Sequence, residues 1–176
     1  NNVIKSIEKI TAPDGLGMSP KRITVSTSGV PKIIRKMADD AVKFNLAVSL
    51  HSALDEVRTE IMPFNEQMPL IELKEALQYW YIKTKKFITY EYVVWRGIND
   101  RDRDIEALID FCLAVPSKVN LIEYNPIDDG QFQQADPEAI DRYVAKLEAR
   151  GITVTVRRSR GKDIDAACGQ LANKNA

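Results

Sequence analysis

The chain has 176 residues, of which 44% are hydrophobic and 28% are charged, and its formal net charge is zero. This length allows one domain with a hydrophobic core, and the neutral balance is not that of a general polyanion binder. No run approaches the roughly 20 apolar residues of a membrane helix, and the first residues lack the pattern of a signal peptide. We therefore expect a cytoplasmic protein without membrane contact. Two cysteines and one histidine make a disulfide framework or a metal site within this chain improbable.

Five short segments rich in β-branched and aromatic residues predict strands: residues 22–27, 46–52, 88–94, 119–125 and 152–157. Between them, apolar residues with helical spacing predict helices that follow Pro31, Pro69, Asp104 and Pro137. The first of these helices has a predicted buried face of Ile33, Ile34, Met37, Ala38 and Ala41. Alternating strands and helices indicate an α/β fold with parallel strands and right-handed crossovers, as a doubly wound sheet or a (β/α) barrel.

Polar side chains gather where the predicted strands end, at the edge from which parallel α/β proteins build their sites. They are Ser26, Ser28, Ser49, His51 and Asn125. Hydroxyl, amide and imidazole groups suit a ribose, an amino-acid carboxylate or an adenine edge. Each residue alone also has a structural explanation, because serine caps helices and a histidine or an Asn-Pro pair is common in turns.

A basic segment lies near the end of the chain. Between residues 142 and 162 there are seven lysines and arginines and a single acid, Glu148. The segment is either a local basic patch or the solvated face of a helix and a strand end.

The motifs occur in an order that identifies a family. STSG at residues 26–29 is followed by SLH (49–51), YEYVV (90–94), GIND (97–100), NLIEYNP (120–126) and RRSRGKDIDAACGQL (157–171). This series resembles the C-terminal half of the dual-specificity RNA methyltransferases that methylate carbon 2 of adenine, which are radical S-adenosylmethionine (SAM) enzymes. The resemblance implies a partial, TIM-like (β/α) barrel of parallel strands. Residues 1–176 would be the C-terminal part of that single domain, with its first two strands missing and residues 152–157 as a flanking strand or extension.

The resemblance also implies a chemistry. Carbon 2 of adenine has no lone pair with which to attack a methyl sulfonium, so the family uses a thiol as carrier. Cys168 would become S-methylcysteine by attacking one SAM. A second SAM, cleaved at a 4Fe–4S cluster, would give a radical that activates this methyl group for addition to adenine. The implied SAM contacts are Ser26, Ser49, Leu50, His51 and Asn125, with Ser28 as a substitute for Ser26 and Leu50 acting through its backbone.

Implied partners are 23S rRNA, tRNA and an electron donor such as flavodoxin or ferredoxin. Arg157, Arg158, Arg160 and Lys162 would meet RNA phosphates, where neutralisation of charge gives affinity with little sequence choice. The small neighbours of Cys168, which are Ala166, Ala167 and Gly169, would leave room for SAM and then a base. Cys112 lies on the apolar face of a predicted helix and is expected to be a buried core residue.

The sequence departs from the family in four respects. It has no Cys-x-x-x-Cys-x-x-Cys loop for the cluster, no Gly-Glu-Pro segment, no N-terminal RNA-recognition domain and no resolving cysteine. We therefore expect a C-terminal fragment that is inactive alone, lacks the cluster ligands and exposes residues 22–27 as a sheet edge. The alternatives are a non-catalytic remnant that binds RNA or a nucleotide, an unrelated α/β barrel enzyme, and the related branch that methylates carbon 8.

Overall fold

A single parallel sheet forms the centre of the computed structural model, which describes residues 2–125 and 132–158. Its strands are β1 (Thr24–Thr27), β2 (Asn45–Ser49), β3 (Ile88–Val94), β4 (Ser117–Glu123) and β5 (Thr153–Arg157). They lie side by side in sequence order, and every neighbouring pair is parallel. The predicted α/β class and all five strands are confirmed. The uninterrupted order excludes the doubly wound alternative, in which the strand order reverses, and is that of a barrel wall.

Helices connect the strands. They are α1 (Asn2–Thr11), α2 (Pro31–Asp39), α3 (Asp55–Ile61), α4 (Leu70–Thr84), α5 (Asp102–Leu113) and α6 (Pro137–Ala149), with short 3-10 turns η1 (Pro20–Arg22) and η2 (Pro63–Glu66). The four predicted helices, α2, α4, α5 and α6, are confirmed. The sequence interpretation missed α1 and α3, and α3 is too short to display a helical period.

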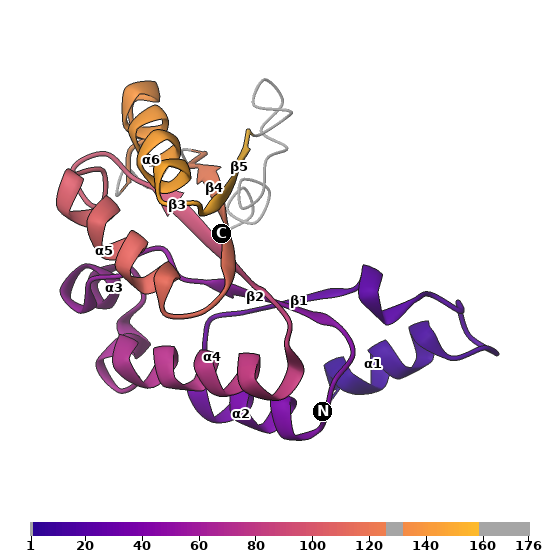
Figure 1. Cartoon of the computed structure of the whole chain (residues 1–176). Coiled ribbons are helices and arrows are strands. Elements are labelled where there is room, and N and C mark those ends of the chain that lie inside the picture. The colour runs from indigo at the N-terminus through magenta and orange to yellow at the C-terminus, as the bar shows by residue number, and fades with distance from the viewer. Residues whose placement is uncertain (1, 126–131, 159–176) are drawn as a thin grey trace, which may run out of the picture.

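The helices cover one face of the sheet. Right-handed crossovers between strands in sequence order bring every crossover helix to the same side, and Figure 1 shows α2 to α6 gathered there. α1 extends away from this layer (Figure 1), and it has no fully buried residue. β1 lies at an end of the sheet, which confirms the prediction that residues 22–27 form an edge.

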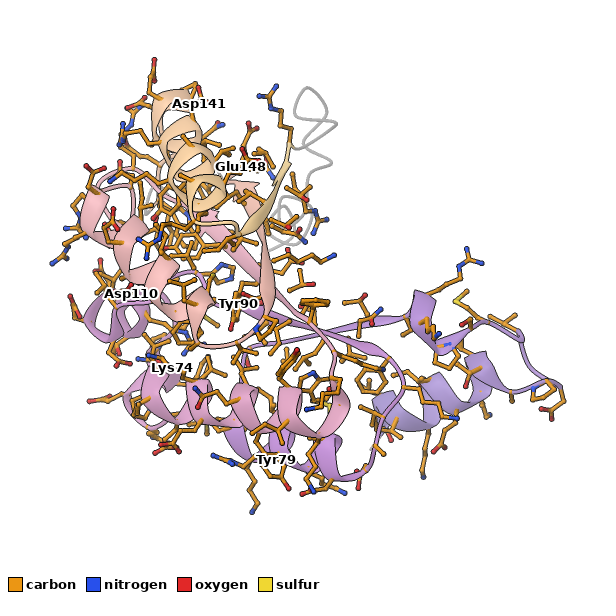
Figure 2. The ribbon with its side chains drawn as sticks, in the orientation of Figure 1. Lys74, Tyr79, Tyr90, Asp110, Asp141 and Glu148 are labelled. Atoms are coloured by element: carbon orange, nitrogen blue, oxygen red, sulfur yellow. The ribbon has the colours of Figure 1, made fainter. Side chains whose placement is uncertain are left out.

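The core lies between the sheet and its helices. Tyr90 of β3 points towards the helix layer (Figure 2), and its ring contacts Phe111 of α5 with a centroid distance of 5.5 Å. Tyr92 makes the corresponding contact with Tyr143 of α6, also at 5.5 Å. Cys112 belongs to this core and is 4% exposed, so the prediction of a buried core cysteine is confirmed.

The prediction of a buried α2 face was wrong for two of its residues, Ile33 and Ala41. Ile34, Met37 and Ala38 are buried, but Ile33 is 48% exposed. Ala41 lies beyond the end of α2 and has a φ of 49°, because the chain turns there towards β2.

Within residues 2–125 and 132–158, no helix combines the length and apolarity needed to cross a bilayer.

Candidate functional site

The predicted contact residues lie along the carboxyl-terminal edge of the sheet. Ser49 ends β2, His51 follows it by two residues, and Asn125 follows β4 by two residues. Ser26 in β1 lies opposite Ala47, which has the same strand parity as Ser49, so both serines face the side of the sheet away from the helices. Ser26 is exposed, whereas Ser49 is half-buried. The structure therefore brings the predicted contact residues of β1, β2 and β4 to one edge of the sheet, as expected from the sequence.

His51 is held as a neutral imidazole. Its backbone has a φ of 57°, and its Nδ1 accepts a hydrogen bond of 3.2 Å from the backbone N–H of Val93. Its ring packs edge-on against Trp95 at a centroid distance of 5.6 Å. Burial, with a contribution from the nearby Arg58 cation, lowers the pKa of His51 to about 4. Because Nδ1 is an acceptor, the proton is on Nε2, which leaves an N–H donor for a ligand.

Leu50 is fully buried, and its backbone polar groups already have partners. Its N–H donates to the carbonyl of Glu91 at 3.0 Å. Its own carbonyl accepts from Nε of Arg58 at 3.1 Å. The same carbonyl also accepts from the N–H of Ser52 at 2.7 Å, so both of its lone pairs are occupied and the Leu50 backbone has no free group for a ligand.

Arg58 of α3 ties the ends of β1 and β2 together, and the sequence interpretation missed it. Its side chain is fully buried, with Nη2 donating to the carbonyl of Ser28 at 2.8 Å and Nη1 to Oδ1 of Asn65 at 2.6 Å. Burial lowers the pKa of Arg58 to about 10, which leaves it cationic at neutral pH. Arginine is rarely buried, so nothing in the local sequence signalled this position.

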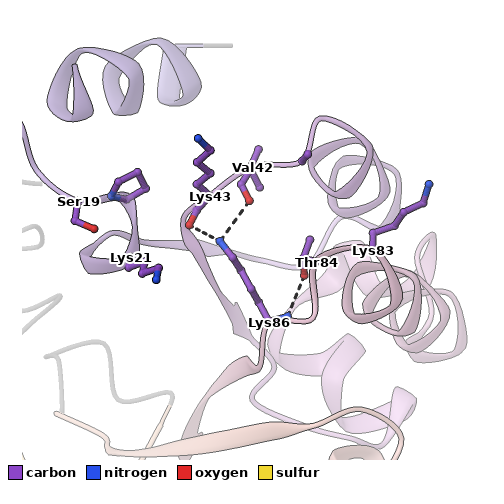
Figure 3. Close-up of a pocket in the computed structure, with 9 residues that line it drawn as sticks. Ser19, Lys21, Val42, Lys43, Lys83, Thr84 and Lys86 are labelled. Atoms are coloured by element: carbon purple, nitrogen blue, oxygen red, sulfur yellow. Dashed lines mark hydrogen bonds between the residues drawn. The ribbon is translucent and has the colours of Figure 1, made fainter. Parts of the chain in front are cut away.

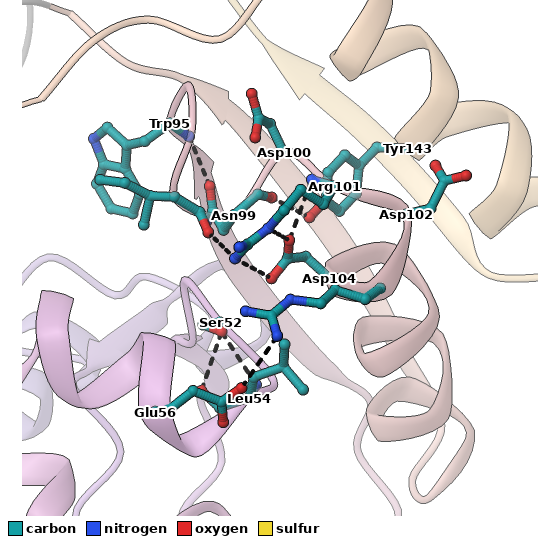
Figure 4. A network of polar contacts seen from close by, with 12 residues as sticks. Ser52, Leu54, Glu56, Trp95, Asn99, Asp100, Arg101, Asp102, Asp104 and Tyr143 are labelled. Atoms are coloured by element: carbon teal, nitrogen blue, oxygen red, sulfur yellow. Dashed lines mark hydrogen bonds and ion pairs between the residues drawn. The ribbon is translucent and has the colours of Figure 1, made fainter.

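Asn99, in the GIND turn, joins the ends of β2 and β3, as Arg58 joins those of β1 and β2 (Figure 4). Its Nδ2 donates to the carbonyls of His51 at 2.7 Å and Val93 at 2.8 Å. Its Oδ1 accepts from the backbone N–H of Trp95 at 2.7 Å. Tyr143 donates to the Asn99 carbonyl at 2.6 Å, so the helix layer supports the turn. These bonds leave the amide side chain of Asn99 no free donor, which makes it a support of His51 rather than a ligand contact.

Three buried polar atoms at this edge have no hydrogen-bond partner within the described residues: Oδ1 of Asn125, the hydroxyl of Tyr124 and Nε1 of Trp95. The rings of Trp95, Tyr124 and Phe132 lie 5.4 to 6.1 Å apart. An unpartnered buried acceptor costs free energy unless a ligand satisfies it. The amide oxygen of Asn125 can accept from the amino group of an adenine, and aromatic rings suit the flat face of the base, so the residues present fit SAM.

The two described arginines of the predicted RNA surface pair with acids of the sheet. Nη1 of Arg157 lies 3.4 Å from Oε2 of Glu91, and Nε of Arg158 lies 3.6 Å from Oε1 of Glu123. Their side chains remain 62% and 80% exposed, so both guanidinium groups stay accessible to a phosphate. Arg160, Lys162 and Cys168 lie outside the described residues.

The residues of this chain do not fit a 4Fe–4S cluster, whose ligands are cysteine thiolates. The sequence has two cysteines, and one of them, Cys112, is buried in the core. Burial raises the pKa of the Cys112 thiol to about 12, which keeps it protonated and inert. Among residues 2–125 and 132–158, no three His, Cys, Asp or Glu side chains are grouped to hold a metal ion.

A hollow of about 390 Å³ lies at the opposite, amino-terminal edge of the sheet (Figure 3). Its lining includes Lys21, Lys43, Lys83 and Lys86. Nζ of Lys86 donates to the carbonyls of Val42 and Lys43, and Lys83 pairs with Asp39 at 3.5 Å. Two of the four lysines are thus occupied by the protein itself, and the carboxyl-terminal edge is the better candidate.

Relatives match the chain along its whole length. A probable dual-specificity RNA methyltransferase, RlmN, of Flavobacterium psychrophilum is 71% identical over 174 residues, which are 99% of this chain and 50% of that protein. The protein of the same name from Christiangramia forsetii is 71% identical over 176 residues, 100% of this chain and 50% of its own length. The one from Cytophaga hutchinsonii is 47% identical over 98% of this chain. The chain therefore spans about half the length of these relatives.

Solved structures agree with the sequence matches. A crystal structure of a radical SAM methyltransferase from Sphaerobacter thermophilus has a TM-score of 0.90 and 38% identity, and the match covers 96% of this chain and 49% of that one. A domain of pyruvate-formate lyase-activating enzyme from Bacteroides vulgatus, with a TM-score of 0.59 and 14% identity, shares the fold alone. No family model matches the chain. The resemblance stated from the motifs is confirmed.

Proposed function

We infer that this chain is part of a dual-specificity RNA methyltransferase of the radical SAM type, the family that its relatives' names and its fold both indicate. The observation that carries this inference is the 71% identity along 99% of the chain to a relative with that name. The carboxyl-terminal edge supports it, because His51 and Asn125 present a free N–H donor and an unpartnered buried acceptor there.

At this edge we propose that SAM is bound by Ser26, Ser49, His51 and Asn125. The backbone of Leu50, whose N–H and carbonyl already have partners within the protein, would hold Ser49 and His51 in position. Nε2 of His51 would donate a hydrogen bond, and Oδ1 of Asn125 would accept one from the adenine amino group. Arg58 and Asn99 would not touch SAM. They would keep the ends of β1, β2 and β3 in place, which spares SAM the free-energy cost of ordering them.

Cys168 is the proposed methyl carrier. Its thiolate would attack the methyl group of SAM, so that an S–CH₃ bond forms at Cys168 and the bond from the methyl carbon to the sulfonium breaks. S-adenosylhomocysteine would leave with the electron pair of that bond. When bound, a second SAM supplies the radical chemistry that activates this carbon. The cluster ligands would come from residues outside this chain.

The proposed acceptor is carbon 2 of adenosine in 23S rRNA and tRNA. Arg157, Arg158, Arg160 and Lys162 would neutralise phosphates of the RNA, and a flavodoxin- or ferredoxin-like protein would supply electrons. With these substrates, the proposed location of the enzyme is the cytoplasm.

This function is tested in the complete enzyme by replacing, one at a time, the two cysteines that this chain contains. We expect Cys168→Ser to abolish formation of 2-methyladenosine, measured by mass spectrometry of digested RNA. Cys112→Ser, a change in the core, should keep product formation per folded molecule. The wild-type peptide that contains Cys168 should carry one extra methyl group. Full methylation by Cys168→Ser would overturn the proposal.

A further inference from the structure

Glu91 is the acidic side chain at the centre of the sheet's helix-free face. It lies in β3, the middle strand, directly opposite Ser49 of β2 and Asn120 of β4. Its neighbours Tyr90 and Tyr92 are fully buried against the helices, so alternation along the strand turns Glu91 to the other face. Its side chain is 15% exposed, which is unusual for a carboxylate on a sheet face that no helix within residues 2–125 and 132–158 covers.

The carboxylate has a fixed orientation. Nδ2 of Asn120 donates to Oε1 at 2.9 Å, and Nη1 of Arg157 donates to Oε2 at 3.4 Å. The backbone carbonyl of Glu91 also accepts the N–H groups of Leu50 at 3.0 Å and His51 at 3.4 Å. One side-chain donor on each oxygen leaves each of them able to accept another hydrogen bond.

The proposed SAM contacts come from β1, β2 and β4, and none comes from β3. Any ligand that reaches from Ser49 to Asn125 must pass over the strand between them. On the helix-free face, β3 presents Thr89, Glu91 and Val93, and Glu91 is the one of these that carries a charge. A ligand that passes there meets two aligned acceptor oxygens.

We propose that Glu91 binds the ribose hydroxyl groups of SAM, with Asn120 and Arg157 as positioning residues; this rests on the function proposed above. A vicinal diol offers two O–H donors side by side, which matches a carboxylate with one free acceptor position on each oxygen. The ion pair with Arg157 does not by itself explain the presence of a carboxylate here, because Arg157 is 62% exposed and exposed ion pairs contribute little to stability.

Competition binding on the complete enzyme tests this role, with adenosine, 2′-deoxyadenosine and 3′-deoxyadenosine displacing labelled SAM. A hydrogen bond to a charged group corresponds to roughly tenfold in affinity or more. We expect wild-type enzyme to prefer adenosine over each deoxy analogue by about tenfold, and Glu91→Gln to reduce that preference to about twofold. Glu123→Gln is the matched control, because it removes the other glutamate–arginine pair of the sheet. It should keep the wild-type preference.

Two results would overturn the assignment. If Glu91→Gln lowers the affinity for all three nucleosides equally and keeps the preference, Glu91 supports the sheet without touching the ribose. If its preference and affinities both equal those of wild type, Glu91 has no role in binding. Wild-type enzyme that binds neither SAM nor adenosine would instead overturn the proposed function, and the ribose contact with it.

Discussion

The backbone N–H of Val93 donates to Nδ1 of His51 at 3.2 Å, so the adjacent strand determines which imidazole nitrogen carries the proton. Protonation of Nδ1 would break this hydrogen bond and place a second cation near Arg58. Burial and that cation are the reasons why the pKa of His51 falls to about 4. The folded state therefore favours the neutral imidazole.

The stability of the protein should depend on pH through His51. Between pH 6.5 and about 4, the unfolded chain binds a proton at His51 that the folded chain does not bind. The free energy of unfolding should therefore decrease as the pH falls through this window, by up to about 3 kcal/mol. Urea denaturation at several pH values within the window measures this change.

His51→Asn is the matched variant, because asparagine tolerates the left-handed backbone at this position and its Oδ1 can accept from Val93. It does not titrate, so this contribution to the pH dependence should disappear. A variant whose stability falls with pH as steeply as that of wild type would show that His51 is not responsible.

Gly29, the last residue of STSG, should not tolerate a side chain. It has a φ of 99°, and a Cβ atom there would lie 3.2 Å from Leu73 and 3.3 Å from Val48. We expect Gly29→Ala to lower the free energy of unfolding by about 2–4 kcal/mol, from backbone strain together with crowding.

Gly151→Ala separates the two causes. Gly151 also has a positive φ, of 72°, but a Cβ atom there would meet nothing within 4 Å. Strain alone should cost about 1–2 kcal/mol. Equal losses for the two variants in urea denaturation would show that Leu73 and Val48 yield to the added methyl group.

The sheet could be predicted because each strand carries its own local signal. Residues 88–94 and 119–125 are rich in β-branched and aromatic residues, and proline marks the starts of α2 and α6. The prediction failed at Ile33 because the helical spacing includes a residue that α2 does not pack against the core. It failed at Ala41 because the spacing continues past the end of α2. Periodicity shows which residues can share a face, but the packing of α2 decides which of them are covered.

The candidate site was predicted only in part, because its supports are distant in sequence. Arg58 reaches the carbonyl of Ser28, thirty residues away, and Asn99 reaches that of His51, forty-eight residues away. No spacing rule connects such pairs, and an arginine in an amphipathic helix indicates solvent exposure. The partners of Arg157 and Arg158 were missed for the same reason.

Asn99 should be more sensitive to an isosteric acid than to truncation. Asn99→Ala leaves the carbonyls of His51 and Val93 without their donor, at a cost of about 1–3 kcal/mol for each buried group. Asn99→Asp instead brings a carboxylate oxygen against both carbonyls, where Nδ2 now lies at 2.7 and 2.8 Å. We expect the aspartate variant to be the less stable of the two at neutral pH, measured by urea denaturation.

Asn45→Asp is the control, because Asn45 makes one exposed side-chain hydrogen bond, to the carbonyl of Lys21 at 2.8 Å. It should change stability by no more than about 1 kcal/mol. An aspartate at position 99 that is as stable as wild type would mean that Asn99 does not join β2 to β3.

Arg158 should contribute to RNA affinity without contributing to sequence choice. Its side chain is 80% exposed, and its pairing with Glu123, at 3.6 Å, leaves the guanidinium free to contact a phosphate as well. In the complete enzyme, Arg158→Ala should weaken binding of tRNA and of unrelated RNA alike and reduce the salt slope of log K by about 1. Lys146→Ala is the control, because Lys146 lies on α6 in the helix layer and pairs with Glu106 and Asp102. A salt slope that is the same in wild type and Arg158→Ala would remove Arg158 from the RNA interface, because loss of a phosphate contact must reduce the number of counterions released.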